Sequence, residues 1–187
     1  MKIVKLVLSL TVISAVCAGV LASVNAVTAD AIRTIRAQQT LDAAAAVMPP
    51  GVDAAQVAQV EEGVFVGKDA SGKAAGYAVK GIDGAGYGGN VVLMVGFTPD
   101  FKIVTYKKLE ASETPGLGSN LTSPGFMKQF AGMDASKALS VRKDGGAVEA
   151  ITSATITSRA VCGAINNAKM KHAIAAKNER PDKFNWS

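Results

Sequence analysis

The sequence predicts an α+β protein, in which one N-terminal transmembrane helix precedes a domain of helices packed on a mixed, partly antiparallel sheet. Two observations carry this prediction. An apolar run without charge extends from Leu6 to Val24. In the rest of the chain, short β-branched runs bounded by turn residues are mixed with helical segments. Because these do not alternate as regular β-α-β units, the pattern indicates α+β.

The apolar run is long enough to cross a bilayer. As a helix with a rise of 1.5 Å per residue, Leu6–Val24 spans about 28 Å, close to the roughly 30 Å of hydrocarbon. A cleaved signal peptide ending at Val24-Asn25-Ala26 is the competing interpretation, but such peptides have shorter apolar regions. We therefore favour a retained single-pass anchor in the cytoplasmic membrane. Lys2 and Lys5 then place the N-terminus in the cytoplasm and the main domain on the extracytoplasmic side.

Three regions are expected: residues 1–28 as N-terminus and anchor, 29–48 as a connecting helix, and 49–187 as the domain. The connecting helix, Asp30 to Val47, ends at Pro49-Pro50-Gly51. Strands are predicted at 64–68, 76–80, 91–97, 103–109 and 139–142, and short helices at 54–59, 124–130 and 135–138. The turn at Thr98-Pro99-Asp100 suits a hairpin, so at least part of the sheet is antiparallel.

Composition excludes several classes of function. The 187-residue chain has a formal charge of +5 from scattered Lys and Arg, which does not indicate nucleic-acid binding. Cys17 and Cys162 lie far apart and form no Cys-x-x-Cys, so this chain alone holds no iron–sulfur cluster or cysteine zinc site. His172 is the only histidine and is expected to be solvated on a Lys-rich helix end. Electron transfer would therefore need an organic cofactor.

A run of hydroxyl side chains precedes the last predicted helix. The hydroxyls are those of Thr152, Ser153, Thr155, Thr157 and Ser158. The helical stripe that follows consists of Val161, Ala164, Ile165 and Ala168. Hydroxyls at this position are candidates for capping a helix, and the first turn of a helix also attracts phosphate. Both interpretations, a helix cap and a phosphate site, are open from these residues alone.

Two glycine-rich segments complete the pattern. In Glu113-Thr114-Pro115-Gly116-Leu117-Gly118, proline fixes one backbone angle and the glycines permit a close backbone approach to a flat ring, although such turns are common. Gly84-Ala85-Gly86-Tyr87-Gly88-Gly89 leads into a strand and fits neither the dinucleotide fingerprint nor a Walker loop.

The order of these motifs resembles a known family. The anchor, Gly86-Tyr87-Gly88-Gly89, Glu113-Thr114-Pro115-Gly116-Leu117-Gly118 and Thr152-Ser153-Ala154-Thr155 resemble the G subunit of the Rnf ion-translocating oxidoreductase complex. The C subunit of the sodium-translocating NADH:quinone reductase is its larger relative. The resemblance covers nearly the whole chain.

The resemblance implies a covalent flavin. In the family, a flavin transferase attaches FMN through its phosphate to the last threonine of the motif, which here is Thr155. Glu149 stands where the family often has Asp, and Ser153 where it often has Gly. The resemblance places Glu113, Thr114, Gly116 and Leu117 near the isoalloxazine ring, and Thr152, Ser153 and Ala154 around the phosphate. No side chain is expected to act as a catalytic acid or base, and no metal is expected.

The resemblance also implies the function. The chain is expected to be an electron-transfer subunit of a membrane complex, working with other membrane and peripheral subunits, that couples ferredoxin:NAD oxidoreduction to Na+ or H+ translocation. A component resembling the C subunit of the quinone reductase is the nearest alternative. A membrane-tethered binding or assembly module without cofactor is the second alternative, and a soluble flavoprotein cleaved after Ala26 is the third.

Overall fold

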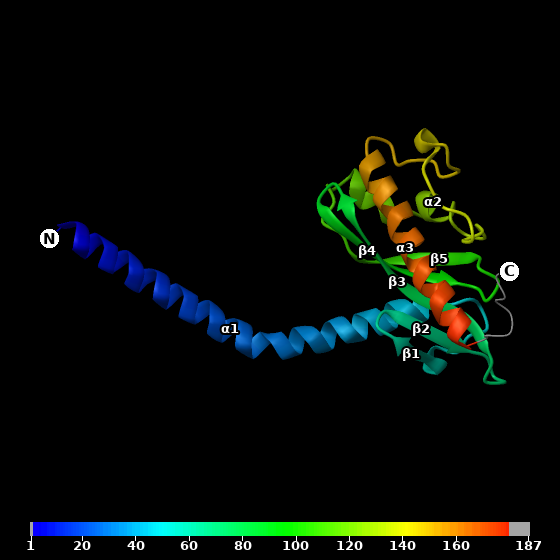
Figure 1. The fold of residues 1–187 in the computed structure, drawn as a ribbon, viewed down its shortest axis with the longest axis horizontal. Helices are drawn as coiled ribbons and strands as arrows, with labels where there is room; N and C mark the ends of the chain where they lie inside the picture. Colours follow the sequence, from blue (N-terminus) through cyan, green and yellow to red (C-terminus); the bar gives the residue numbers. More distant parts are fainter. Residues whose placement is uncertain (1, 180–187) are drawn as a thin grey trace. The chain divides into compact units, whose positions relative to one another are not determined.

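A computed structural model describes residues 2–179 of the chain (Figure 1) and the side chains of residues 3–173. Residue 1 of the predicted anchor region and residues 180–187 of the predicted domain lie outside this range. The chain divides into two compact units, Met1–Gln39 and Thr40–Ser187. The elements are α1 (Lys2–Ala46), η1 (Ala54–Gln56), β1 (Val57–Glu61), β2 (Val64–Lys68), β3 (Ala74–Gly86), β4 (Gly89–Phe97), β5 (Ile103–Glu110), η2 (Gly118–Thr122), α2 (Pro124–Met127), η3 (Arg142–Asp144) and α3 (Thr155–Glu179).

The first unit is formed by helix α1, and the candidate membrane span, Ile3–Ala46, lies within this helix. Helix α1 runs without a break through the predicted anchor and the predicted connecting helix. It includes a stretch of mean hydropathy 2.3, apolar and long enough to cross a membrane. The hydroxyls of Thr11 and Ser23 donate to the carbonyls of Val7 and Gly19 at 2.9 and 2.8 Å. These polar groups are thereby satisfied within the helix, as a hydrocarbon environment requires.

The second unit is built on an antiparallel meander with strand order β1-β2-β3-β4-β5. Strand β2 has the predicted bounds, and the β4–β5 pairing confirms the predicted hairpin. All pairings in this sheet are antiparallel, so it is not mixed. The predicted helix at 54–59 is wrong beyond Gln56, because Val57 enters β1 and pairs with Gly67.

Alternate residues of the central strands face two different helices. Phe65, Ala78 and Met94 form one apolar cluster with the last turn of α1 and the residues after it, and their strand neighbours form the main core with α3. Glycine permits close contact on both faces. A Cβ at Gly96 would lie 1.8 Å from the carbonyl oxygen of Val47, and one at Gly81 would lie 2.0 Å from that of Ala164.

Helix α3 buries the predicted apolar stripe of Val161, Ala164, Ile165 and Ala168. The prediction for His172 is wrong: its side chain is 0% exposed. Its ring lies 4.5 Å from the ring of Tyr77 and 5.0 Å from that of Phe97. The reason is periodicity, because position 172 follows 165 and 168 on the buried face of the helix. Burial lowers the pKa of His172 to about 4.

The segment before α3 has less regular structure than predicted. Helix α2 ends at Met127, residues 135–138 form no helix, and the predicted strand 139–142 is reduced to a bridge between Val141 and Val148. The side-chain amide of Asn166, on α3, accepts from the N–H of Leu139 at 2.9 Å and donates to its carbonyl at 2.8 Å. The Asn166 side chain thus satisfies the backbone N–H and carbonyl of Leu139, which in a β-sheet would bond to a neighbouring strand.

Candidate functional site

Three distant segments of the domain enclose a cavity of about 470 Å³. They are the β3–β4 turn, the loop after β5 and the start of α3. The lining residues are Tyr87, Glu113, Thr114, Leu117, Gly118, Ser153, Ala154, Thr155, Ile156 and Thr157. This volume is typical of a small-molecule site.

Most of the sequence-predicted site residues meet in this cavity. It is lined by Glu113, Thr114 and Leu117 from the loop, and by Ser153, Ala154 and Thr155 from the start of α3. Gly116 and Thr152 instead line a neighbouring cavity of about 580 Å³, which shares Leu117 and Ser153 with the first. The two predicted groups of residues, one for a ring and one for a phosphate, are therefore adjacent in space.

The carboxylate of Glu113 connects the three walls. Its Oε2 accepts a hydrogen bond from the hydroxyl of Thr157 at 2.5 Å, and its Oε1 accepts one from the N–H of Gly88 at 3.3 Å. A Cβ at Gly118 would lie 2.5 Å from Oε2 of Glu113 and 2.7 Å from the hydroxyl oxygen of Thr157. Glycine at position 118 thus leaves the space in which this hydrogen bond forms.

The loop that carries these residues is fixed to the sheet. The buried Tyr106 of β5 donates a hydrogen bond from its hydroxyl to the carbonyl of Leu121, in η2. Gly88, at the β3–β4 turn, packs so closely on the loop that a Cβ there would lie 1.6 Å from the carbonyl oxygen of Ser112. The cavity walls are therefore anchored from two sides.

The first turn of α3 presents free backbone donors. The first hydrogen bond of the helix runs from the N–H of Ser158 to the carbonyl of Ala154 at 3.0 Å. Within the described residues, the N–H groups of Thr155, Ile156 and Thr157 have no recorded acceptor. Such donors and the helix dipole attract an anion. The alternative that Thr155 or Thr157 caps the helix is wrong, because both lie within it and Ala154 precedes it.

The hydroxyl groups of this run differ in availability. Thr157 and Ser158 are 1% and 0% exposed. Both are engaged: Thr157 donates to Glu113, and Ser158 donates to the carbonyl of Ala154 while accepting from the N–H of Ile151. Thr155 is half-buried, and among the described residues its hydroxyl has no recorded hydrogen bond. Thr155 is therefore the hydroxyl on α3 that lines the cavity and is available for a new bond.

Ser153 adopts a backbone conformation that favours glycine. Its φ is 60°, in the left-handed region that costs a non-glycine residue about 1–2 kcal/mol. This geometry explains why the resembled family often has glycine at that position. Two residues before Ser153, the N–H of Ile151 donates to the hydroxyl of Ser158 at 2.9 Å, which ties this loop to α3.

The Ser153→Gly substitution is expected to raise the free energy of unfolding by about 1 kcal/mol, because relief of strain exceeds the added entropy of the unfolded chain. Thr152→Gly is the matched control. Because Thr152 does not have a positive φ, this substitution relieves no strain and should lower the free energy of unfolding. Urea unfolding of the full chain in detergent measures both. Destabilisation by both substitutions to the same extent would contradict strain at Ser153.

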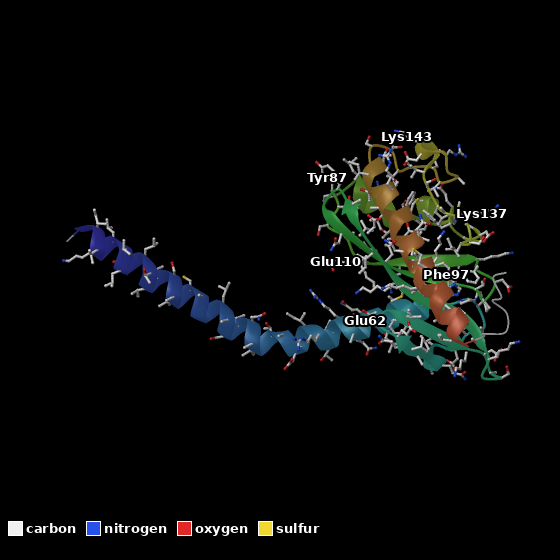
Figure 2. The ribbon with its side chains drawn as sticks, viewed as in Figure 1. Glu62, Tyr87, Phe97, Glu110, Lys137 and Lys143 are labelled. Atoms are coloured by element: carbon white, nitrogen blue, oxygen red, sulfur yellow. The ribbon has the colours of Figure 1, made fainter. Side chains whose placement is uncertain are left out.

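Four lining residues were not predicted as site residues: Tyr87, Gly118, Ile156 and Thr157. Tyr87 lies in the turn between β3 and β4 and is 72% exposed (Figure 2). With Leu117 and Ile156, which are 42% and 46% exposed, it supplies an apolar rim suited to a flat ring. An aromatic residue between glycines, in Gly86-Tyr87-Gly88-Gly89, was a usable signal. The sequence carries no signal of the Thr157–Glu113 hydrogen bond, because this contact depends on the tertiary fold.

Comparisons with known proteins agree on the region of the cavity. The FMN-binding domain family matches residues 86–169, which include all three cavity walls. The G subunit of the ion-translocating oxidoreductase complex of Methanosarcina acetivorans is 34% identical over 89% of this chain and 93% of its own length. The G subunit of the Na(+)-translocating ferredoxin:NAD(+) oxidoreductase complex of Acetobacterium woodii is 34% identical, with 87% of each chain covered.

A solved structure has a similar fold. The crystal structure of NqrC from Shewanella oneidensis superimposes with a TM-score of 0.50 and 26% sequence identity. The match covers 62% of this chain and 60% of the other. It confirms the predicted α+β fold class.

Proposed function

Because this chain belongs to the family of G subunits of the ion-translocating oxidoreductase complexes, we propose that it carries electrons on an FMN bound in the cavity at the start of α3. The complex is a redox-driven ion translocase, in which this chain is an electron carrier without substrate turnover of its own. Its partners are the other membrane and peripheral subunits of that complex. We propose that the complex couples ferredoxin:NAD oxidoreduction to ion movement, as the name of the relative from Acetobacterium woodii states for that protein.

One observation carries the proposal most directly. The cavity brings the unbonded Thr155 hydroxyl together with the Glu113 loop and the free N–H groups of the first turn of α3. A flat isoalloxazine ring needs apolar walls, and a phosphate needs donors. We assign Glu113, Thr114, Gly116 and Leu117 to the ring side, with Tyr87 added. The phosphate side is assigned to Thr152, Ser153 and Ala154.

We further propose that FMN is attached covalently to Thr155. The oxygen of the Thr155 hydroxyl forms a bond to the phosphorus of a flavin nucleotide whose phosphate is activated by a leaving group. The bond to the leaving group breaks, and that group takes the hydroxyl proton. A separate flavin transferase is the partner required for this step. Bound flavin supplies the redox chemistry, and the chain's own residues hold and orient it.

The chain is anchored in the membrane through α1, which contains the candidate span. We propose that the domain lies on the extracytoplasmic side, because Lys2 and Lys5 precede the apolar run and basic residues favour the cytoplasmic side. A covalent bond suits this location, since a cofactor that cannot dissociate does not depend on a free flavin pool.

Co-expression with a flavin transferase tests the proposal. The full-length protein is expected to show a fluorescent band on a denaturing gel and a mass increase of one FMN less one water. Expression without the transferase is the control and should give neither. A chain that remains unlabelled beside the transferase, while a known acceptor protein is labelled, would favour the alternative of an assembly module without cofactor.

A further inference from the structure

Thr155 also lines a third cavity, which is smaller than the cavity of about 470 Å³ described above. It has a volume of about 250 Å³ and is lined by Arg142, Lys143, Glu149, Ala150, Ile151, Thr152, Ser153 and Thr155. Thr155 lines both this cavity and the larger one. A phosphate on the Thr155 hydroxyl therefore lies at the boundary between two different environments.

The two cavities differ in the charge of their walls. Glu113 is the charged residue that lines the larger cavity, and its carboxylate would repel a phosphodiester. Two cations, Arg142 and Lys143, line the smaller cavity with Glu149. This balance of charge would direct a bound phosphate away from Glu113 and toward η3.

The two cations of the smaller cavity differ in their ion pairing. Arg142 pairs with Glu149 at 3.0 Å. Within residues 3–173, Lys143 forms no recorded salt bridge. The next carboxylate along the chain is occupied by another cation, because Asp144 accepts from Nε and Nη2 of Arg159 at 2.7 and 2.8 Å. Among the described residues, Lys143 is thus the cation of this cavity that is outside any salt bridge.

The turn that carries Lys143 is held firmly against the start of α3. The Asp144–Arg159 pair joins η3 to the second turn of the helix, and it lowers the pKa of the Asp144 carboxyl. The N–H of Arg142 donates to the carbonyl of Val148 at 2.8 Å. In Figure 2, Lys143 is drawn at the end of the domain where α3 begins.

We propose that Lys143 is the counter-cation of the Thr155 phosphodiester, so that the phosphate faces the smaller cavity while the flavin ring occupies the larger one. This inference rests on the proposed covalent flavin. It assigns to Lys143 a positioning role that neither the motif nor the family match specifies. The paired Arg142 maintains the shape of the cavity, and Lys143 supplies the charge that attracts the phosphate.

A thermodynamic cycle tests the contact between Lys143 and the phosphate. Labelled and unlabelled full-length chains are separated by ion exchange and melted in detergent, both as wild type and as Lys143→Gln. Labelling is expected to raise the Tm of the wild type by about 2 °C more than that of Lys143→Gln, the size of one exposed charge contact. This difference should shrink in ~1 M salt, where the Debye length falls to about 3 Å.

Two further variants make the test specific. Lys143→Arg should retain the wild-type gain, because the charge is kept. Lys137→Gln removes an exposed lysine that lines none of the cavities at Thr155, and it should also retain the gain. Equal gains for wild type and Lys143→Gln would overturn the proposal, even though both proteins are labelled. A wild type that cannot be labelled would instead defeat the covalent flavin itself.

Discussion

The Thr155→Val variant is expected to carry no covalent flavin after co-expression with a flavin transferase. Valine has nearly the shape of threonine but lacks the hydroxyl, so the half-buried position stays filled while the bond to phosphorus cannot form. The loss should be complete, and in-gel fluorescence together with intact mass measures it. Thr155→Ser keeps a hydroxyl and should remain labelled.

Thr157→Val is the matched control for this experiment. Thr157 lines the same cavity but donates its hydroxyl to Glu113. Its removal should leave labelling on Thr155 and cost about 1 kcal/mol of stability, since the partly buried Glu113 carboxylate loses a hydrogen bond. Covalent flavin on Thr155→Val, or loss of label only in Thr157→Val, would show that the attachment residue is assigned wrongly.

The second large effect is a loss of stability in mild acid. The pKa of His172 falls from 6.5 to about 4 through burial among aromatic rings. Below pH 6.5 the unfolded chain takes up a proton at this residue, and the folded chain does not. The contribution of neutral His172 to the free energy of unfolding should therefore be fully present above pH 6.5. It should fall by roughly 3 kcal/mol as the pH drops to about 4.

Urea unfolding at a series of pH values measures this loss, and His172→Phe serves as the control. Phenylalanine retains the contacts with Tyr77 and Phe97 but does not titrate, so most of the dependence between pH 6.5 and 4 should disappear. Asp69, Asp134 and Asp144 interfere little, because their pKa values are lowered from 3.8 in the folded chain. The stability that they contribute is lost mainly below about pH 4, under this window. An unchanged pH profile in His172→Phe would rule out His172 as the cause.

Local patterns predicted the parts of the fold that depend on local chemistry. The Val64–Lys68 strand followed from a short β-branched run between turn residues, and the α3 stripe followed from apolar spacing with a period of 3.6; β2 and α3 confirm them. The prediction for His172 is wrong because the apolar period of α3 continues to position 172 despite the lysines on either side. The 139–142 segment was misread because the amide of Asn166 substitutes for a strand, a contact between residues far apart in sequence.

The sequence predicted the short motifs of the candidate site but not the contacts between them. The Glu113 loop and the Thr155 motif are short and recognisable, and the structure brings their residues together around one cavity. The left-handed backbone of Ser153 is a three-dimensional property, although the glycine of related motifs hinted at it. Lys143 and Thr155 line one cavity, and the Asp144–Arg159 ion pair joins their segments, which no spacing in the chain reveals.

The meander has a consequence for the order in which the domain is assembled. Each strand of the β1-β2-β3-β4-β5 sheet pairs with the strand synthesised just before it. Pairing of this kind closes only short loops and is kinetically favoured. Helix α3 is synthesised after all five strands and packs on the sheet that they form. The surroundings of Thr155 are therefore completed after the sheet, so flavin attachment would act on a domain whose strands are already present.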